Sequence, residues 1–178
     1  MKHLLRDLSD FDEYVPGKGI DEVARELGLY ADEMVKLASN ENPLGAPPRA
    51  VEKLEKHSEE MSVYPTALHD DVRQHVAEYA DAGMGSVTEN DDVGVVLGAG
   101  ADGVFDTIGR AVIEDGDAIL TPSPGFSYYG MSARNLGGVE RSYELKKDEG
   151  FEIRPERIID SYDGQDIVYI TTPNNPTG

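Results

Sequence analysis

The chain has 178 residues, enough for one domain with a substantial hydrophobic core. It contains no cysteine, which excludes disulfide bonds and thiolate metal sites. Its 35 acidic residues against 16 basic ones give a formal net charge of −19, which argues against nucleic acid or an anionic membrane as a partner because either would need a basic face.

The acidic residues are spread along the chain rather than gathered in one tail. This distribution predicts adaptation to concentrated salt, where screening over roughly 3 Å at 1 M weakens repulsion among like charges. A halophilic cytoplasm is therefore favoured over an ordinary acidic cytosolic protein. No apolar stretch reaches the roughly 18 residues of a membrane-spanning helix, and residues 1–7 lack the apolar core of a signal peptide, so we expect a cytoplasmic protein.

The first 45 residues are expected to form an arm with one short helix rather than a compact unit. Apolar side chains recur at helical spacing at Ile20, Val23, Ala24 and Leu27, and Gly28 follows as a C-terminal cap.

Two amphipathic helices are expected next. Pro47 and Pro48 open the first helix, whose apolar face holds Val51, Leu54 and Met61. Thr66 is expected to cap the second helix and Gly83 to end it, with four inward-facing residues: Leu68, Val72, Val76 and Tyr79.

From Asp92 onward, short apolar runs alternate with helical patterns. We expect strands at 93–97, 118–121, 139–145 and 166–171, and helices at 102–114, 126–136 and 155–161. Such alternation predicts an α/β fold with crossover connections and a mostly parallel sheet.

The segment Gly98-Ala99-Gly100-Ala101-Asp102-Gly103 stands between an expected strand and an expected helix. Small residues let the backbone approach an anion, and a helix start offers unpaired N–H groups and the positive end of its dipole. The segment therefore predicts a phosphate site. Asp102 is expected to cap the helix rather than to bind the anion, because a carboxylate beside a phosphate is repelled.

The same six residues also spell the G-x-G-x-x-G pattern of dinucleotide-binding folds. Those folds need an acidic residue roughly 20 positions further on, after the next strand, to hold a ribose hydroxyl. Here that strand ends in Pro122-Ser123-Pro124-Gly125, and Glu114, Asp115 and Asp117 come before it. A nicotinamide-dependent oxidoreductase is thus the least favoured reading.

Aromatic side chains follow the expected strand 118–121. Phe126 is the best candidate for the wall of a pocket that holds a flat heteroaromatic cofactor, whereas Tyr128 and Tyr129 are expected in the core. A second group of polar residues, 171–178, follows the apolar run 167–170 and places an Asn-Pro turn at the carboxyl end of a strand, where open α/β sheets bind ligands.

Residues 174–178, Asn-Asn-Pro-Thr-Gly, resemble the signature of fold-type I pyridoxal-phosphate (PLP) aminotransferases. Residues 14–18 (Tyr-Val-Pro-Gly-Lys), 40–45 (Asn-Glu-Asn-Pro-Leu-Gly) and 64–65 (Tyr-Pro) precede the phosphate loop in the order seen in the amino-terminal half of the histidinol-phosphate aminotransferase family. The resemblance covers nearly the whole chain and implies PLP as the cofactor.

The resemblance also implies roles for cofactor-binding residues. Gly100 would admit the PLP phosphate to the backbone N–H groups of Ala101 and Asp102. Phe126 would stack on the pyridine ring, where many relatives have Tyr, and Asn175 would bond the phenolic oxygen.

Other implied roles concern a homodimer and the substrate. Tyr64 would reach the phosphate of the neighbouring subunit's cofactor. Tyr14 would lie near the substrate phosphate, and Asn40 and Asn42 near the substrate end of the pocket.

The family's Schiff-base lysine lies well beyond the Asn-Pro-Thr-Gly turn, so no catalytic residue is expected in this chain. The chain has seven lysines, at residues 2, 18, 36, 53, 56, 146 and 147. None of them matches the position of the Schiff-base lysine. We expect an amino-terminal fragment that consists of an arm and substrate-side segment, 1–45, and the first part of an incomplete PLP-binding large domain, 46–178.

The implied reaction is amino transfer between L-histidinol phosphate and 2-oxoglutarate in histidine biosynthesis. An aromatic amino-acid aminotransferase and a threonine-phosphate decarboxylase share nearly all these motifs and remain alternatives. A non-catalytic, truncated PLP-binding module is the alternative from another class.

Overall fold

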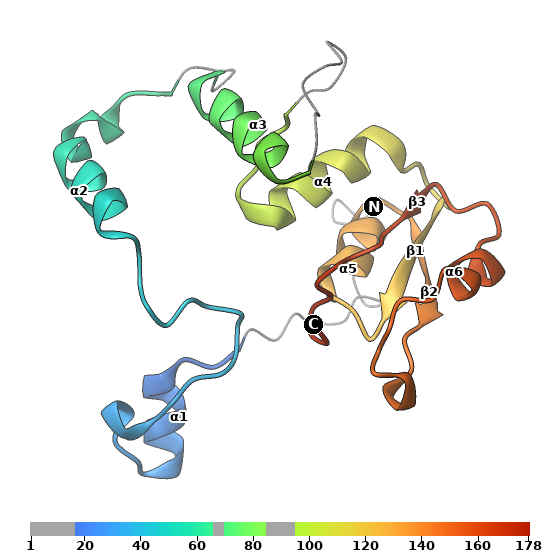
Figure 1. Ribbon diagram of the computed structural model, residues 1–178, viewed down its shortest axis with the longest axis horizontal. Coiled ribbons are helices and arrows are strands. Elements are labelled where there is room, and N and C mark those ends of the chain that lie inside the picture. The colour runs from blue at the N-terminus through green and yellow to red at the C-terminus, as the bar shows by residue number, and fades with distance from the viewer. Residues whose placement is uncertain (1–16, 66–69, 85–94) are drawn as a thin grey trace, which may run out of the picture. The chain divides into compact units, whose positions relative to one another are not determined.

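The computed structural model describes residues 17–65, 70–84 and 95–178. The chain divides into two compact units that meet in sequence between Tyr64 and Pro65 (Figure 1). The motifs predict a different division, into a substrate-side arm of residues 1–45 and a cofactor-binding part from residue 46. That division concerns function and stays a prediction.

The described part of the first unit, residues 17–64, contains four short helical elements: α1 (Ile20–Leu27), η1 (Ala31–Glu33), α2 (Pro48–Lys56) and η2 (Ser58–Ser62). The expected first helix is confirmed. Gly28 ends it in the left-handed conformation, at φ 66°, and its N–H bonds the carbonyl of Ala24. Pro48 stands in the first turn of α2, as expected, but Met61 lies in η2 rather than on the face of α2.

The second unit contains the sheet and most of the helices. In chain order its elements are α3 (Asp70–Met84), α4 (Gly100–Val112), β1 (Ala118–Ser123), α5 (Tyr128–Asn135), β2 (Val139–Glu144), η3 (Lys147–Glu149), α6 (Pro155–Ser161) and β3 (Ile167–Val168). The expected alternation of strands and helices after residue 117 is confirmed.

The sheet has three strands in the order β2-β1-β3, and both pairs are parallel. Ile119 of β1 stands opposite Glu140 on one side and Ile167 on the other. Residues 119–122 of β1 are buried, as expected of a strand that is covered on both faces. The predicted α/β fold with a parallel sheet is thus confirmed.

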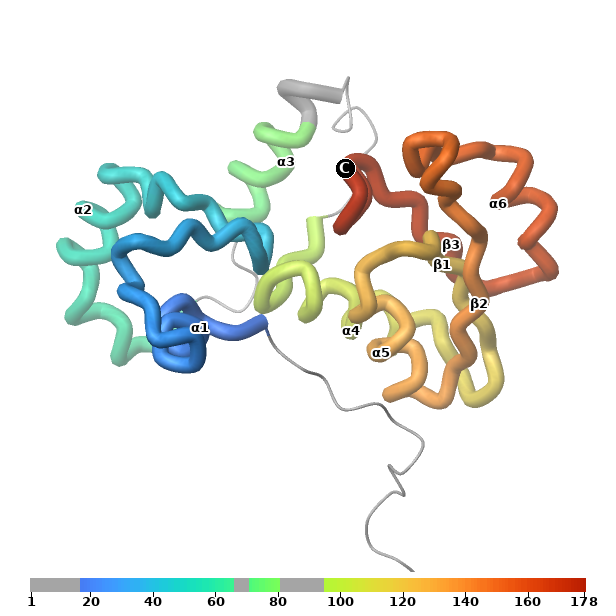
Figure 2. Tube along the Cα trace, turned by 90° about the horizontal axis from the view of Figure 1, so that it is seen from below, coloured from blue at the N-terminus to red at the C-terminus, as the bar shows by residue number. Residues whose placement is uncertain are grey.

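Two apolar clusters cover the opposite faces of β1. Ile119 packs with Tyr129 and Ala133 of α5, while Leu120 packs with Tyr143 and with Ile158 of α6. Figure 2 shows α5 and α6 on opposite sides of the strands. Successive side chains of a strand point to opposite faces, so the neighbouring residues Ile119 and Leu120 belong to different layers of the core.

Two expected strands differ from the structure. Residues 93 and 94 lie outside the described ranges, and residues 95–97 form no strand, because none of the strands described here pairs with them. The last strand is only Ile167–Val168 rather than 166–171, although the N–H of Tyr169 still bonds the carbonyl of Leu120 at 2.8 Å. The chain then turns away into the Asn-Pro segment.

The expected inward face of α3 is wrong for the residues that the structure describes. Val72, Val76 and Tyr79 are 52%, 39% and 84% exposed. Gly83 lies inside α3 rather than at its end, and the expected cap Thr66 and Leu68 lie outside the described residues. In the described ranges, no helix combines the length and the apolar character that crossing a bilayer requires.

Candidate functional site

The turn before α4 depends on a glycine at position 98. A Cβ on Gly98 would lie 2.7 Å from the backbone nitrogen of Val104 and 2.8 Å from the carbonyl carbon of Gly103. These neighbours are backbone atoms and cannot swing aside. The close approach packs the backbone at Gly98 directly against the first turns of α4.

Gly100 is the first residue of α4 and has a φ of +68°, a conformation that side chains strain. Apart from its own helix and its chain neighbours, no heavy atom of the described residues lies within 4 Å of the position that a Cβ would take. The first N–H groups of a helix have no acceptor inside the helix. This end of α4 therefore combines N–H donors that lack an acceptor within the helix with space that no other described residue fills, as an anion site requires.

Asp102 does not cap the helix, contrary to the expectation. Ala99 occupies the N-cap position without a side-chain bond, and Asp102 lies in the first turn of α4. The helix begins two residues earlier than expected because Gly100 accepts the left-handed backbone. In the first turn, the Asp102 carboxylate interacts favourably with the helix dipole.

Phe126 lies in the loop between β1 and α5 (residues 124–127, the β1 loop) and is half-buried. Its ring centre is 6.4 Å from that of Phe105 in α4 and 5.6 Å from that of Tyr129 in α5. Phe105 contacts Tyr129 edge-on at 5.0 Å as well. These aromatic contacts attach α4 to the β1 loop, which holds the proposed ring platform.

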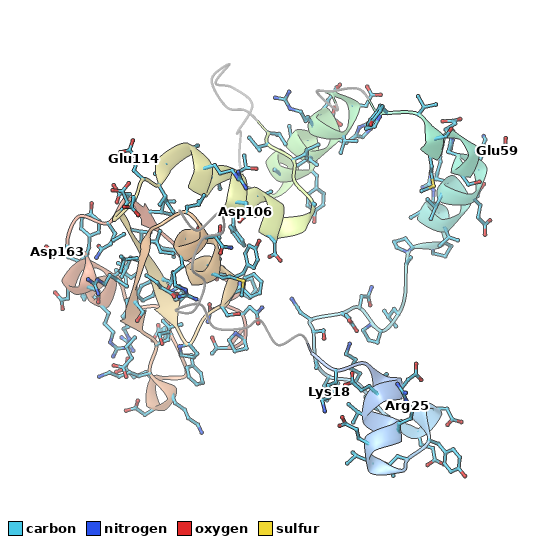
Figure 3. The ribbon with its side chains drawn as sticks, turned by 180° about the vertical axis from the view of Figure 1, so that it is seen from behind. Lys18, Arg25, Glu59, Asp106, Glu114 and Asp163 are labelled. Carbon is cyan, nitrogen blue, oxygen red and sulfur yellow. The ribbon has the colours of Figure 1, made fainter. Side chains whose placement is uncertain are left out.

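Tyr129 is 5% exposed and belongs to the core, as expected, but Tyr128 has a polar role. The Tyr128 hydroxyl donates to Asp106 Oδ2 at 3.2 Å, and the Ser132 hydroxyl donates to Oδ1 of the same carboxylate at 2.7 Å. Figure 3 labels Asp106 on the side of α4 that faces α5. Burial, and then the Asp106 charge, raises the pKa of Tyr128, so its phenol stays a donor at neutral pH.

The segment after β3 (residues 169–178, the β3 loop) places Asn174 and Asn175 differently. Asn175, the expected cofactor ligand, is exposed, whereas Asn174 is 5% exposed. Asn174 Nδ2 donates to the carbonyl oxygen of Pro124 at 3.0 Å and to Thr177 Oγ1 at 2.9 Å. Sequence analysis did not single out Asn174. The signal was the pair of asparagines before Pro176, of which one is buried and bonds the neighbouring loop while the other is exposed.

A cavity of about 330 Å³ opens beside the β1 loop, between the carboxyl half of β1 and strand β2. Its nine lining residues are Thr121, Pro122, Ser123, Gly125, Phe126, Ser127, Glu140, Arg141 and Ser142. The Glu140 carboxylate accepts from the Thr121 hydroxyl at 3.0 Å and from Arg134 at 2.9 Å. These two bonds stabilise the half-buried negative charge of Glu140, so the cavity beside the β1 loop has a polar lining on this side.

The expected residues thus fall into two groups. Gly100, Ala101, Asp102, Phe126 and Asn175 all belong to the second unit, where the Phe105–Phe126 contact and the Asn174–Pro124 bond join their segments. Asn40, Asn42 and Tyr64 belong to the first unit, and Tyr14 lies outside the described residues.

The first-unit residues have local geometry of their own. Asn42 Oδ1 accepts from the N–H of Leu44 at 3.0 Å and closes a turn, while Asn40 has a left-handed φ of 50°. Tyr64 is 97% exposed. Their roles toward a substrate or a neighbouring subunit stay predictions. Among the described residues, no group of three potential metal ligands comes together.

Comparisons with known proteins identify the family. Residues 32–178 match the family described as aminotransferase class I and II. Histidinol-phosphate aminotransferases of Haloarcula marismortui and Natronomonas pharaonis are 48% and 47% identical over 173 residues, which cover 97% of this chain and 46% of each relative. The chain therefore spans about half the length of the curated relatives that it matches.

Solved structures show the same fold. An aspartate aminotransferase double mutant of Thermus thermophilus gives a TM-score of 0.75 at 21% identity, over 97% of this chain and 46% of that one. Substrate-bound BacF of Bacillus subtilis gives 0.71 at 20% identity, over 86% and 39%. These likenesses confirm the expected fold-type I architecture. Since the family match also spans most of the sequence, the chain belongs to the class I and II aminotransferases.

Proposed function

We propose that the chain is the amino-terminal part of a PLP-dependent aminotransferase that exchanges an amino group between L-histidinol phosphate and 2-oxoglutarate. One observation carries the proposal: α4, which begins at an open glycine turn, contacts the half-buried Phe126 ring through the ring of its Phe105. The substrate assignment rests on the names of relatives that are 42% to 48% identical, all histidinol-phosphate aminotransferases of halophilic archaea.

The residues present fit a phosphorylated, flat cofactor. The open space at Gly100 suits a phosphate group, which the N–H groups of Ala101 and Asp102 would hold by hydrogen bonds. Phe126 would stack on the ring, held in place by Phe105 and Tyr129. Asn175 would donate to the phenolic oxygen. When bound, PLP supplies an electron sink that stabilises negative charge at the substrate's α-carbon.

The first unit supports the further proposal of a homodimer. Many of its large apolar or aromatic side chains are exposed, and Tyr64 is 97% exposed. Among them are Leu27, Leu29, Tyr30, Val35, Leu37, Leu44, Leu54, Met61, Val63 and Tyr64. Apolar surface of this extent favours burial against another protein surface. A second copy would take that place, with Tyr64 reaching its partner's phosphate site and Tyr14, Asn40 and Asn42 lining the substrate end.

A purified product of the whole gene tests the proposal. We expect bound PLP, visible by its absorption, and 2-oxoglutarate-dependent turnover that forms glutamate and prefers histidinol phosphate over phenylalanine, with no decarboxylation of threonine phosphate. Absence of PLP would refute the cofactor assignment, and preference for phenylalanine or decarboxylation of threonine phosphate would replace the substrate assignment. Residues 1–178 made alone are expected to show no turnover, and borohydride with PLP should label no single lysine; stoichiometric labelling with turnover would contradict this.

A further inference from the structure

Asn174 spans the gap between the two loops that carry the proposed cofactor contacts. Its Nδ2 atom uses both of its hydrogens, one toward the carbonyl oxygen of Pro124 in the β1 loop and one toward Thr177 Oγ1 in its own loop. Pro124 stands two residues before Phe126, and Asn174 directly precedes Asn175. One side chain thus lies beside both the ring platform and the proposed phenolic-oxygen ligand.

The orientation of this amide follows from its surroundings. Were it reversed, Oδ1 would face the Pro124 carbonyl, and two acceptors would oppose each other. In the observed orientation Oδ1 is buried and has no hydrogen-bond partner among the described residues. A buried acceptor without a partner is unfavourable, and the two hydrogen bonds of Nδ2 offset this unfavourable free energy in the observed orientation.

A second contact near Asn174 reinforces the same junction. The Tyr129 and Thr171 hydroxyl oxygens lie 2.9 Å apart, and the Tyr129 ring stacks on Tyr169 with centres 4.3 Å apart. The β3 loop is therefore attached to α5 on one side of Asn174 and to the β1 loop through Asn174 itself. Movement of Asn175 relative to Phe126 requires that the Asn174 bonds break.

We propose that Asn174 is a positioning residue of the cofactor site: it sets the distance between Phe126 and Asn175 and touches neither the cofactor nor the substrate. The proposal rests on the proposed function, because it assigns these two residues to PLP. It predicts that weakening the Asn174 bonds loosens the grip on PLP in a protein that is still folded.

The test uses the product of the whole gene and its PLP-free form. Asn174→Asp keeps the size of the side chain but replaces the donor with an oxygen that faces the Pro124 carbonyl. We expect PLP to bind at least about tenfold more weakly, by equilibrium dialysis, and the absorption maximum of bound PLP to shift. Thr177→Val removes one acceptor and leaves the Pro124 bond, so we expect a smaller loss of about two- to threefold.

Asn135→Asp makes the same chemical change at an exposed position in the last turn of α5 and should leave PLP affinity unchanged. All affinities are measured below the unfolding temperature of each PLP-free variant. If Asn174→Asp fails to fold, the affinity of Thr177→Val decides the question. Unchanged PLP affinity and absorption in folded variants, with only a lower unfolding temperature, would overturn the inference. Failure of the unaltered protein to bind PLP would instead refute the proposed function.

Discussion

The phenol oxygen of Tyr129 lies 2.9 Å from the hydroxyl oxygen of Thr171, which joins the first turn of α5 to the segment that follows β3. Either atom can donate. Because the Tyr129 side chain is buried, the bond is shielded from water and from competing partners. The contact also lies where the two loops of the candidate site leave the sheet, so its energy bears on the geometry of that site.

A double-mutant cycle measures this bond. Tyr129→Phe and Thr171→Val are each expected to lower the free energy of unfolding by about 1 kcal/mol, because each removes one partner of a buried hydrogen bond. The double variant should lose less than the sum of the two, since a single bond is removed. Urea unfolding of the full-length protein, followed by circular dichroism, gives the three values.

Tyr79→Phe serves as the control for loss of a phenol, because Tyr79 is 84% exposed on α3. It should leave the unfolding curve unchanged. Strict additivity of the Tyr129 and Thr171 effects would show that the two hydroxyls do not interact.

Phe105 contacts three other aromatic residues, and its removal should affect both the core and the candidate site. Its ring centre lies within 6.4 Å of those of Phe126, Tyr129 and Tyr169. Phe105→Ala is expected to lower the free energy of unfolding by about 3 kcal/mol, and Phe105→Leu by less, because leucine refills part of the space. Denaturant unfolding compares the two, and equal losses would contradict a packing role.

The sequence predicted the second unit well where local pattern and packing agree. The strand at 118–121 and the helix at 155–161 were predicted close to their observed positions, since each has an unambiguous pattern and turn residues at both ends. Residues 95–97 of the expected strand 93–97 form no strand, for a different reason. A strand is defined by its ladder partner, and that partner cannot be read from the strand's own residues.

The candidate site could be predicted only in part. Glycines at 98 and 100 and the ring at 126 were recognisable, because their chemistry is unusual for their positions. The task of Asn174 depends on the carbonyl of Pro124, which is 50 residues away in sequence. The expected helix cap at Asp102 failed because the left-handed Gly100 lets α4 begin earlier.

Alkaline pH should destabilise the protein through two tyrosines of the second unit, the buried Tyr143 and the half-buried Tyr169. Burial raises the pKa of Tyr143 and of Tyr169 above the ordinary value. The folded state then holds these phenol protons more tightly than the unfolded state, so the associated stability is present below about pH 10 and is lost as the pH rises further. Unfolding temperatures measured across this range should fall.

Tyr143→Phe removes one of these groups together with its 2.9 Å bond to the carbonyl of Tyr169. We expect lower stability at neutral pH, by about 1 kcal/mol, but a shallower fall at alkaline pH. A fall as steep as in the unaltered protein would mean that Tyr143 does not contribute to it.

The chain has 35 acidic and 16 basic residues, and this excess of negative charge should make its stability depend on salt. Screening weakens repulsion among carboxylates, so we expect the unfolding temperature to rise with KCl up to molar concentrations. A non-ionic osmolyte at matched osmolality separates screening from general solvent effects and should give a smaller rise. Maximal stability at low salt would assign the charge another cause.

The glycine turn before α4 offers the sharpest distinction between a single-phosphate site and a dinucleotide site. Gly100→Val places a branched side chain at a φ of +68° and in the open space beside the helix start, so we expect weaker PLP binding and a modest loss of stability. Gly98→Ala instead collides with the backbone of Val104 and Gly103 and should destabilise the fold.

Asn175→Ala completes the comparison: Asn175 is exposed, and on the proposed function its side chain would bond PLP, so its loss should change PLP absorption without changing the unfolding temperature of the PLP-free protein. A dinucleotide site would behave differently: NAD would bind, would protect the protein from proteolysis, and would lose affinity in Gly100→Val, while Asn175→Ala would have no effect. The strand after α4 offers no acid for a ribose hydroxyl, so we expect NAD neither to bind nor to protect. Tight NAD binding without PLP absorption in the purified full-length protein would overturn the proposed activity.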